Sequence, residues 1–174
     1  MTAQRILIMG LPGAGKTYLA TALKHYIAHR SDFFNPGAKT LTASTATVEW
    51  FNADAVRKQF NDWDFSHEGR IRQSHRMREL ADQSSADFVI ADFVAPLPEM
   101  RHNFKADWTI WMDTIDQGRF EDTNRVFAPP EVYDFRVTEQ HSQKWAEFIG
   151  DHIIADRRRP QFNWRRETVQ MLGR

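Results

Sequence analysis

Short apolar runs alternate with longer amphipathic stretches along this 174-residue chain. Apolar runs bounded by polar or turn-forming residues predict buried strands, at 6–9, 47–51, 87–92, 108–112 and 134–137. Apolar residues spaced three or four apart predict helices at 16–28, 66–84, 99–105 and 142–154, and a further helix begins at Ala55. Strands that alternate with helices indicate an α/β fold, a doubly wound five-stranded parallel sheet covered on both faces.

Two segments lack this periodicity. Residues 31–47 are rich in Ser, Thr, Gly and Pro, which predicts a loop. Residues 113–130 are polar and close on Pro129-Pro130. A long polar loop before the last strand is where phosphotransferases carry a lid, and we expect one here. The last helix is expected to turn Trp145, Phe148, Ile149 and Ile153 inward.

Residues 10–17 match the Walker A motif G-x-x-x-x-G-K-[ST] at each fixed position. They follow a predicted strand and open a predicted helix, the context in which this motif binds phosphate. Its backbone N–H groups close around a polyphosphate, and the helix adds its positive end. We therefore expect ATP to be bound by Gly10, Leu11, Pro12, Gly13, Ala14, Gly15, Lys16, Thr17 and Tyr18. Lys16 would act catalytically on the β/γ oxygens, and the Thr17 hydroxyl would ligate Mg²⁺.

Polar residues also close the next two predicted strands, at the edge of an open sheet where ligands bind. Asp54 is a candidate catalytic base for a substrate hydroxyl, and Arg57 is a candidate clamp for phosphate or sulfate. The alternative is structural, with Asp54 capping the helix that begins at Ala55 and pairing with Arg57. Asp92 closes the third strand as in a Walker B motif and would orient Mg²⁺ through water, or be a solvated strand end.

Other basic residues are weaker candidates. The lid segment contains Arg119 and Arg125, either of which could reach a transferring phosphate or lie on the surface. Arg125 is the favoured catalytic candidate. The helix at 66–84 carries Arg70, Gln73 and Arg76 on one face, which taken alone is more typical of a solvated surface.

The composition bears on which partners and which kinds of metal or disulfide site the protein could have. The formal net charge is zero, which gives no support to a nucleic-acid or membrane partner through a bulk field. The sequence contains no cysteine, which excludes a disulfide framework and a thiolate metal site. No apolar run approaches 18 residues and the first residues do not resemble a signal peptide, so we expect a cytoplasmic protein without a membrane partner.

Several segments together resemble the adenylylsulfate kinase family of P-loop phosphotransferases, over roughly residues 4 to 155. Residues 52–57, Asn-Ala-Asp-Ala-Val-Arg, are similar to the family's D-G-D-x-x-R. Phe65-Ser66 through Arg70, Gln73 and Arg76 is similar to F-S-x-x-D-R-x-x-N-x-x-R. Residues 93–96, Phe-Val-Ala-Pro, stand where the family has F-x-S-P.

The resemblance implies a P-loop kinase fold with a lid and Mg²⁺-dependent transfer of the ATP γ-phosphate to the 3′-hydroxyl of adenylylsulfate. Asp54 would then be the catalytic acid/base. The acceptor site would be lined by Arg57, Phe65, Arg70, Gln73 and Phe93. The Phe65 ring would stack on a base, and the guanidinium groups would hold phosphate and sulfate.

The sequence also departs from the family pattern. Asn52-Ala53 replaces Asp-Gly, Gly69 replaces an acid, Gln73 replaces Asn, and Asp92 replaces a small neutral residue. The family's lid is lysine-rich, whereas residues 116–139 hold six acids and three arginines. Two alternatives therefore stay open. One is a kinase acting on a hydroxyl in nucleic acid, at a polynucleotide end or a 5-hydroxymethyl pyrimidine. The other is a non-catalytic nucleotide-binding module of a fused protein.

The domain organisation follows from the same segments. Residues 1–155 are expected to form the kinase domain, and residues 156–174 a basic tail or linker. Residues 168–174 resemble the first strand of nucleotidyltransferases that carry an H-x-G-H motif, so the tail could lead into another domain. The expected partner is a small-molecule or nucleotide acceptor. A nucleic acid is less favoured, and a homodimer is compatible with the sequence.

Overall fold

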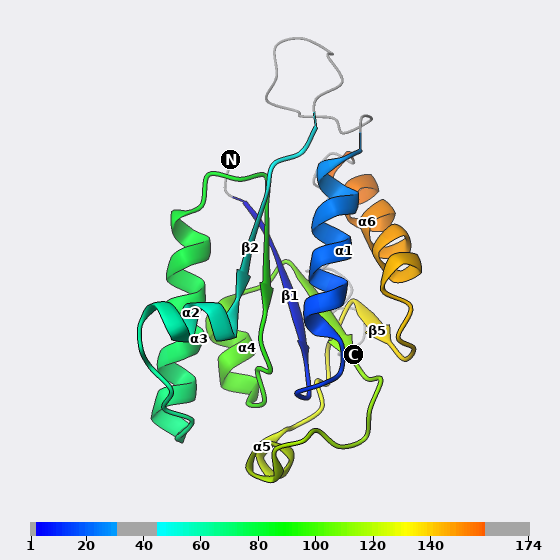
Figure 1. Cartoon of the computed structure of the whole chain (residues 1–174). Helices are drawn as coiled ribbons and strands as arrows, with labels where there is room; N and C mark the ends of the chain where they lie inside the picture. Colours follow the sequence, from blue (N-terminus) through cyan, green and yellow to red (C-terminus); the bar gives the residue numbers. More distant parts are fainter. Residues whose placement is uncertain (1–2, 31–44, 159–174) are drawn as a thin grey trace, which may run out of the picture.

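The computed structural model describes residues 3–30 and 45–158 and has a sheet between two layers of helices (Figure 1). The strands are β1 (Gln4–Gly10), β2 (Val48–Asn52), β3 (Phe88–Asp92), β4 (Trp108–Met112) and β5 (Phe135–Val137). They pair in parallel in the order β2-β3-β1-β4-β5. The predicted doubly wound, five-stranded parallel sheet is confirmed. Residues 31–44 of the loop expected at 31–47, and residues 159–174 of the tail expected at 156–174, lie outside the described residues.

Alternating side chains of β1 separate the two halves of the core. Ile6 and Ile8 point to the layer formed by α1 (Lys16–Ala28) and α6 (Ser142–Arg158), whereas Leu7 and Met9 point to the opposite layer. The second layer contains α2 (Ala53–Gln59), α3 (His67–Gln83) and α4 (Pro98–Phe104). Because β1 is covered on both faces, its apolar run is continuous, as expected for a central parallel strand.

The strand order places a crevice at one end of the sheet. From β1 the chain crosses to the β2 side, whereas from β3 it crosses over β1 to β4. Such a reversal leaves a crevice at the carboxyl ends of the strands, here between β1 and β3. A short helix, α5 (Glu121–Val126), lies at the same end of the molecule (Figure 1).

Helices α5 and α6 differ from the sequence-based expectations. Helix α5 forms within the segment expected to be an aperiodic loop, because six residues are too few to give a helical pattern. Helix α6 continues to Arg158, across the expected boundary at 155. Phe148 was expected to point inward but is 51% exposed. Its ring packs against those of Trp145 and Phe135 at the edge of the layer, while Ala146 and Ile149 face the core.

Candidate active site

The loop between β1 and α1, residues 10–17 and called the phosphate loop below, needs glycine at two positions for different reasons. Gly10 has a φ of 146°, and a Cβ there would lie 2.5 Å from the Met112 carbonyl oxygen. Gly15 has a φ of 93° and precedes α1 without a side-chain cap on the helix. The first N–H groups of α1 are therefore left for a ligand, and the helix dipole favours an anionic one.

The segment that follows β4 packs closely on the phosphate loop. Met112 meets Gly10, and the Thr114 hydroxyl donates to the Ala14 carbonyl over 2.8 Å. A Cβ on Gly118 would lie 3.0 Å from both the Cδ and the carbonyl oxygen of Pro12. Three successive contacts thus fix the start of the segment that leads to α5 against the phosphate loop.

Lys16 is folded back over the phosphate loop. Its Nζ donates to the carbonyl oxygens of Gly10 at 3.0 Å and Leu11 at 2.9 Å. Burial lowers the pKa of Lys16 to about 8, an effect that the carboxylates of Asp92 and Asp54 partly offset. A bound polyphosphate would supply the negative charge that restores an ordinary lysine pKa, so this ammonium group suits an anionic ligand.

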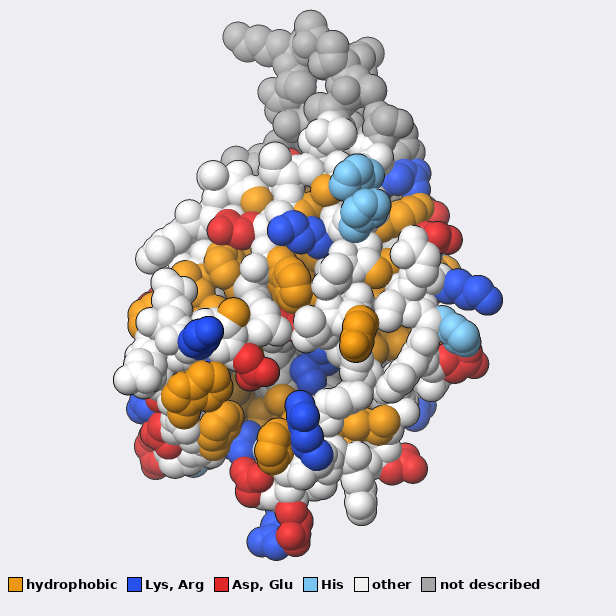
Figure 2. All heavy atoms as spheres, in the orientation of Figure 1, with side chains coloured by type: hydrophobic (Ala, Val, Ile, Leu, Met, Phe, Trp, Pro, Cys, Tyr) orange, Lys and Arg blue, Asp and Glu red, His pale blue; other side chains and the backbone are white. Residues whose placement is uncertain are grey.

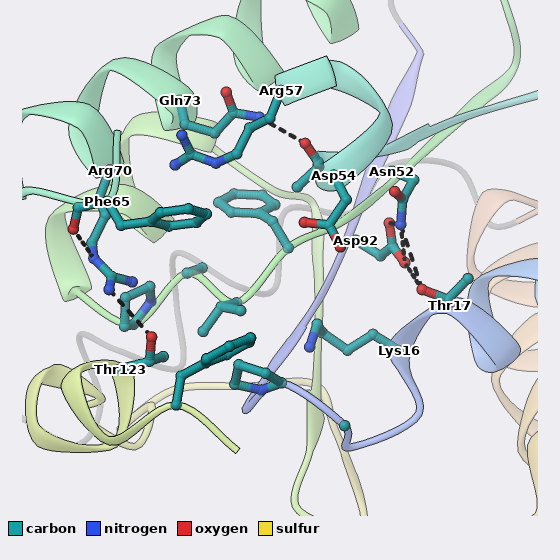
Figure 3. Close-up of a pocket in the computed structure, with 18 of the residues that line it drawn as sticks. Lys16, Thr17, Asn52, Asp54, Arg57, Phe65, Arg70, Gln73, Asp92 and Thr123 are labelled. Atoms are coloured by element: carbon teal, nitrogen blue, oxygen red, sulfur yellow. Dashed lines mark hydrogen bonds between the residues drawn. The ribbon is translucent and has the colours of Figure 1, made fainter. Parts of the chain in front are cut away.

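Asp92 lies at the centre of a hydrogen-bond cluster beside Lys16 (Figure 3). Its carboxylate accepts from the Thr17 hydroxyl at 3.0 Å, the Asn52 amide at 3.0 and 3.2 Å, and the Trp50 indole at 3.3 Å. Asp92 is only 2% exposed, and burial raises its pKa to about 6 despite these donors. It is therefore a hard oxygen group held in a fixed orientation next to Thr17.

Asn52 has two structural roles at the end of β2. It stands opposite Asp92 in the pairing of β2 with β3, which brings the two side chains together. Its Oδ1 also accepts from the Ala55 backbone N–H at 3.0 Å and so caps α2. The alternative in which Asp54 caps this helix is therefore wrong. Asp54 lies in the first turn of α2, exposed at the cavity.

A cavity of about 620 Å³ opens beside the phosphate loop. It brings together the expected Lys16, Thr17, Asp54, Arg57, Phe65, Arg70, Gln73, Asp92 and Phe93. Residues of α5 and the turn before it, including Arg119 and Thr123, also line it. In the space-filling view the surface is hollowed at this end of the molecule, with basic and apolar side chains around the hollow (Figure 2).

Phe65 projects into the cavity between two buried guanidinium groups (Figure 3). The Cζ of Arg57 lies 4.6 Å from the centre of its ring, and the Cζ of Arg70 lies 5.9 Å away. Arg57 donates to the carbonyl oxygens of Asp62 and Asp64 at 3.0 and 2.9 Å rather than to Asp54. The ring is about half exposed, so a flat group could stack on it.

Gln73 is fixed between α2 and α3. Its amide donates to the Ala53 carbonyl at 3.2 Å, and its Oε1 accepts from Arg76 at 2.8 Å. With 2% of its surface exposed, Gln73 forms a wall of the cavity and holds the carbonyl next to Asp54.

Arg70 connects α3 with α5. Its Nε donates to the Phe65 carbonyl at 2.8 Å, and its Nη2 donates to Asp122 at 2.9 Å and to the Thr123 hydroxyl at 3.2 Å. No local pattern in the sequence identifies Asp122 and Thr123 as site residues, because they reach Arg70 only through the tertiary fold.

The two arginines of the lid segment have different positions. Arg119 lines the cavity, and its charge helps lower the pKa of Lys16. Arg125, the favoured candidate from the sequence, is not among the cavity residues and pairs with Glu121 on the exposed side of α5. The structure therefore does not bring Arg125 to the cavity, because its position one turn after Glu121 on α5 directs its guanidinium to solvent.

A second, smaller cavity of about 230 Å³ lies on the other side of the phosphate loop. It is lined by Gly15 and Tyr18 at the start of α1 and by Glu139, Gln140 and Ser142 between β5 and α6. Tyr18 is 78% exposed beside it. The phosphate loop thus stands between two hollows, an arrangement that suits a reaction between two bound molecules.

Within residues 3–30 and 45–158, no group of three or more His, Cys, Asp or Glu side chains is arranged to hold a metal ion. None of the helices in these residues has the length and hydropathy required for a membrane span.

Comparisons with known proteins agree with this fold. The APS kinase of Mycobacterium tuberculosis in complex with AMPPNP and APS shares 17% identity, with a TM-score of 0.65. The alignment covers 87% of this chain and 98% of that one. Shikimate kinase from Acinetobacter baumannii in complex with shikimate shares 16% identity over 91% and 97% of the two chains, with a TM-score of 0.56. No curated protein sequence matches significantly.

The sequence model of the adenylylsulphate kinase family matches residues 2–114, well over half of the chain. This match contains the phosphate loop, Asp54, Arg57, Phe65, Arg70 and Asp92, and it ends before α5. The chain belongs to the adenylylsulphate kinase family and is a P-loop kinase.

Proposed function

We propose that the protein transfers the γ-phosphate of ATP to the 3′-hydroxyl of adenylylsulfate. The observation that carries the proposal is the shared cavity, in which the phosphate loop and Asp54 face Phe65 between Arg57 and Arg70. A stacking ring beside cationic groups suits an acceptor with a flat base and an anionic end. Holding this acceptor against the phosphate loop would make the transfer effectively unimolecular.

The donor would lie along the phosphate loop. Its phosphates would accept from the N–H groups of residues 10–17, and Lys16 would move from the Gly10 and Leu11 carbonyls to the β/γ oxygens. The smaller cavity beside Tyr18 would take the nucleoside. The γ-phosphate would then lie at the boundary between the two cavities, facing the acceptor.

Asp54 would accept the proton of the acceptor hydroxyl as its oxygen attacks. The carboxylate is exposed at the cavity, and its charge acts on both Lys16 and Arg57. Positioned proton transfer of this kind contributes roughly 10²–10⁴-fold to a rate. Arg119, on the lid side of the cavity, would stabilise the charge that develops on the transferring group.

The residues beside the phosphate loop fit Mg²⁺. The Thr17 hydroxyl and the Asp92 carboxylate are hard oxygen donors 3.0 Å apart, and the Asn52 amide orients the carboxylate. Thr17 would hold the ion directly and Asp92 through water, with the nucleotide supplying further oxygens. When bound, the ion neutralises charge on the phosphates.

One observation favours the alternative of a hydroxyl in nucleic acid. Trp63, Phe65 and Phe120 line the cavity and are each about half exposed, and exposed rings can stack on bases of a single strand. The zero net charge provides no general attraction to a polyanion. A small nucleotide acceptor therefore remains the better match.

The decisive experiment measures ADP release from ATP with adenylylsulfate or with hydroxymethylated DNA as the acceptor. We expect adenylylsulfate to support release, and Asp54→Asn to reduce it by about 10²–10⁴-fold. Glu79→Gln, which alters an exposed carboxylate on α3 outside the cavity, is the matched control and should behave like the wild type. If ADP were released with hydroxymethylated DNA and not with adenylylsulfate, the acceptor would be DNA. An active Asp54→Asn variant would refute the assignment of Asp54 as the base.

A further inference from the structure

The ion pair between Arg70 and Asp122 is strongly asymmetric in its exposure to solvent. Only 8% of the Arg70 side chain is exposed, compared with 66% of the Asp122 side chain. A buried guanidinium requires a partner, because leaving it unpaired carries a large desolvation cost. An exposed carboxylate loses little when it returns to water. The arginine is therefore the fixed member of the pair, and the carboxylate is the exchangeable one.

The hydrogen bonds around Arg70 support this division. Its Nε is held by the Phe65 carbonyl, so the group keeps its position when Nη2 changes partner. The Thr123 hydroxyl, which is buried beside Nη2, would remain to contact a new anion. Asp122 and Thr123 both line the cavity, so an anion that enters it meets this pair directly.

The exchange does not require α5 to unfold. The Asn124 side chain bonds both the N–H and the carbonyl of Gly118 at 2.9 Å, which closes the turn before the helix. After the helix, the Ala128 N–H donates to the Pro96 carbonyl at 2.9 Å. Because both ends of α5 are held, rotation of the Asp122 side chain into solvent is sufficient to free Arg70.

We propose that Asp122 is a specificity-determining residue that competes with the acceptor for Arg70. A tetrahedral oxyanion, such as the sulfate or phosphate group of a nucleotide, displaces the carboxylate when it binds Nη2 of Arg70. Acceptors with such a group bind by exchanging one anion for another, and the apparent affinity falls by the fraction of molecules in which Asp122 holds the site. The identification of the anion as part of adenylylsulfate rests on the proposed function, whereas the competition itself does not.

The test uses inorganic sulfate as the probe, titrated calorimetrically at constant ionic strength. Asp122→Asn should lower the dissociation constant for sulfate by about tenfold, the gain expected if Asp122 holds Arg70 about nine-tenths of the time. The matched control is Glu121→Gln, which removes a carboxylate from the same first turn of α5. Glu121 pairs with Arg125 outside the cavity, so this variant should bind sulfate as the wild type does.

A double variant tests whether the gain in sulfate affinity depends on Arg70. In Arg70→Gln the Asp122→Asn substitution should produce no change in sulfate affinity. If Asp122→Asn binds sulfate equally or more weakly, if Glu121→Gln gives the same gain, or if the gain survives without Arg70, the proposal is wrong. Asp122→Ser provides a second test if the Asn variant folds poorly.

Steady-state kinetics with adenylylsulfate separate a failure of this proposal from a failure of the proposed function. With adenylylsulfate, Asp122→Asn should lower the KM for the acceptor in parallel with the dissociation constant for sulfate. If the wild type releases no ADP with adenylylsulfate, that acceptor is wrong, but the sulfate titrations still decide whether Asp122 competes for Arg70.

Discussion

The two sides of the cavity are built in different ways. The phosphate side comes from eight consecutive residues, 10–17, whose shape depends on backbone conformations that glycine permits. The acceptor side comes from four separate segments, around Asp54, Phe65, Phe93 and Asp122, and its shape depends on side-chain contacts between them.

This difference determines what each side tolerates. In the phosphate loop the groups offered to a ligand come from consecutive residues, and the contacts from outside, by Met112, Thr114 and Gly118, fix the position of the loop. On the acceptor side Arg57 is held by carbonyls five and seven residues away, whereas Arg70 also depends on Asp122, 52 residues away. We therefore infer that the acceptor side is the part of the cavity whose ligand preference can change.

The largest expected effect is on the rate of phosphoryl transfer, after substitution of Lys16 on the phosphate side of the cavity. Lys16→Met removes the ammonium group that neutralises the β/γ oxygens and should reduce the rate of phosphoryl transfer by about 10²-fold or more. Stability should hold or rise slightly, because this ammonium is already disfavoured by burial. Steady-state kinetics and thermal melting measure both quantities. Lys24→Met, on the exposed side of α1, is the control and should change neither.

A smaller effect concerns the pH dependence of stability that Asp92 causes. Asp92 closes β3 and accepts from Thr17 of the phosphate loop. Its pKa is about 6 when folded and 3.8 in its ordinary state, so the folded protein binds this proton more tightly. Stability from Asp92 therefore decreases as pH rises from about 4 to 6. Asp92→Asn should remove that decrease and be more stable than the wild type near pH 7 by roughly 3 kcal/mol, while losing activity.

Urea unfolding of both proteins at pH 4.5 and pH 7 measures this prediction. Asp62 and Asp64 act with the opposite sign, because hydrogen bonds, mainly from Arg72 to Asp62 and from Ser66 to Asp64, lower their pKa values. Both proteins contain these two carboxylates, so the difference between the proteins isolates Asp92. An Asn variant that is less stable than the wild type at pH 7 would show that the charged carboxylate stabilises the site.

The smallest effect distinguishes the two lid arginines. Arg119→Ala should lower kcat by about fivefold, because a contact that strengthens as charge develops acts mainly on the chemical step. Arg125→Ala should stay within about twofold of the wild type, since it loses only an exposed ion pair with Glu121. Kinetics on the two single variants measure the contrast. The opposite result would mean that α5 rotates when substrates bind and brings Arg125 into the cavity.

The same contrast explains what could be predicted from the sequence. The sheet and the phosphate loop follow from apolar runs and a contiguous motif, so their residues could be assigned without knowledge of the tertiary fold. Asn52 was visible only as a departure from a pattern, because its contact with Asp92 depends on the pairing of β2 with β3. Trp50 lies two residues earlier on the same face of that strand, and its indole also donates to Asp92.

The sequence predicts a lid segment, but the course of that segment could not be predicted in this way. Sequence position favours Arg125 over Arg119, but the course of this segment is set by Gly118 against Pro12 and by Asn124 bonding to Gly118. These contacts join residues without a shared periodicity. In the sequence Asp122 is one of several acids of the lid segment, and only the fold brings it to Arg70.

The three contacts of the segment after β4 with the phosphate loop have a consequence for how this chain can vary. Met112 meets Gly10, Thr114 bonds Ala14, and Gly118 packs on Pro12. Each contact fixes one point of the segment, so the number of residues between these points is constrained as strongly as their identity. An insertion or deletion between these points would therefore shift α5 relative to the phosphate loop and change the shape of the cavity between them.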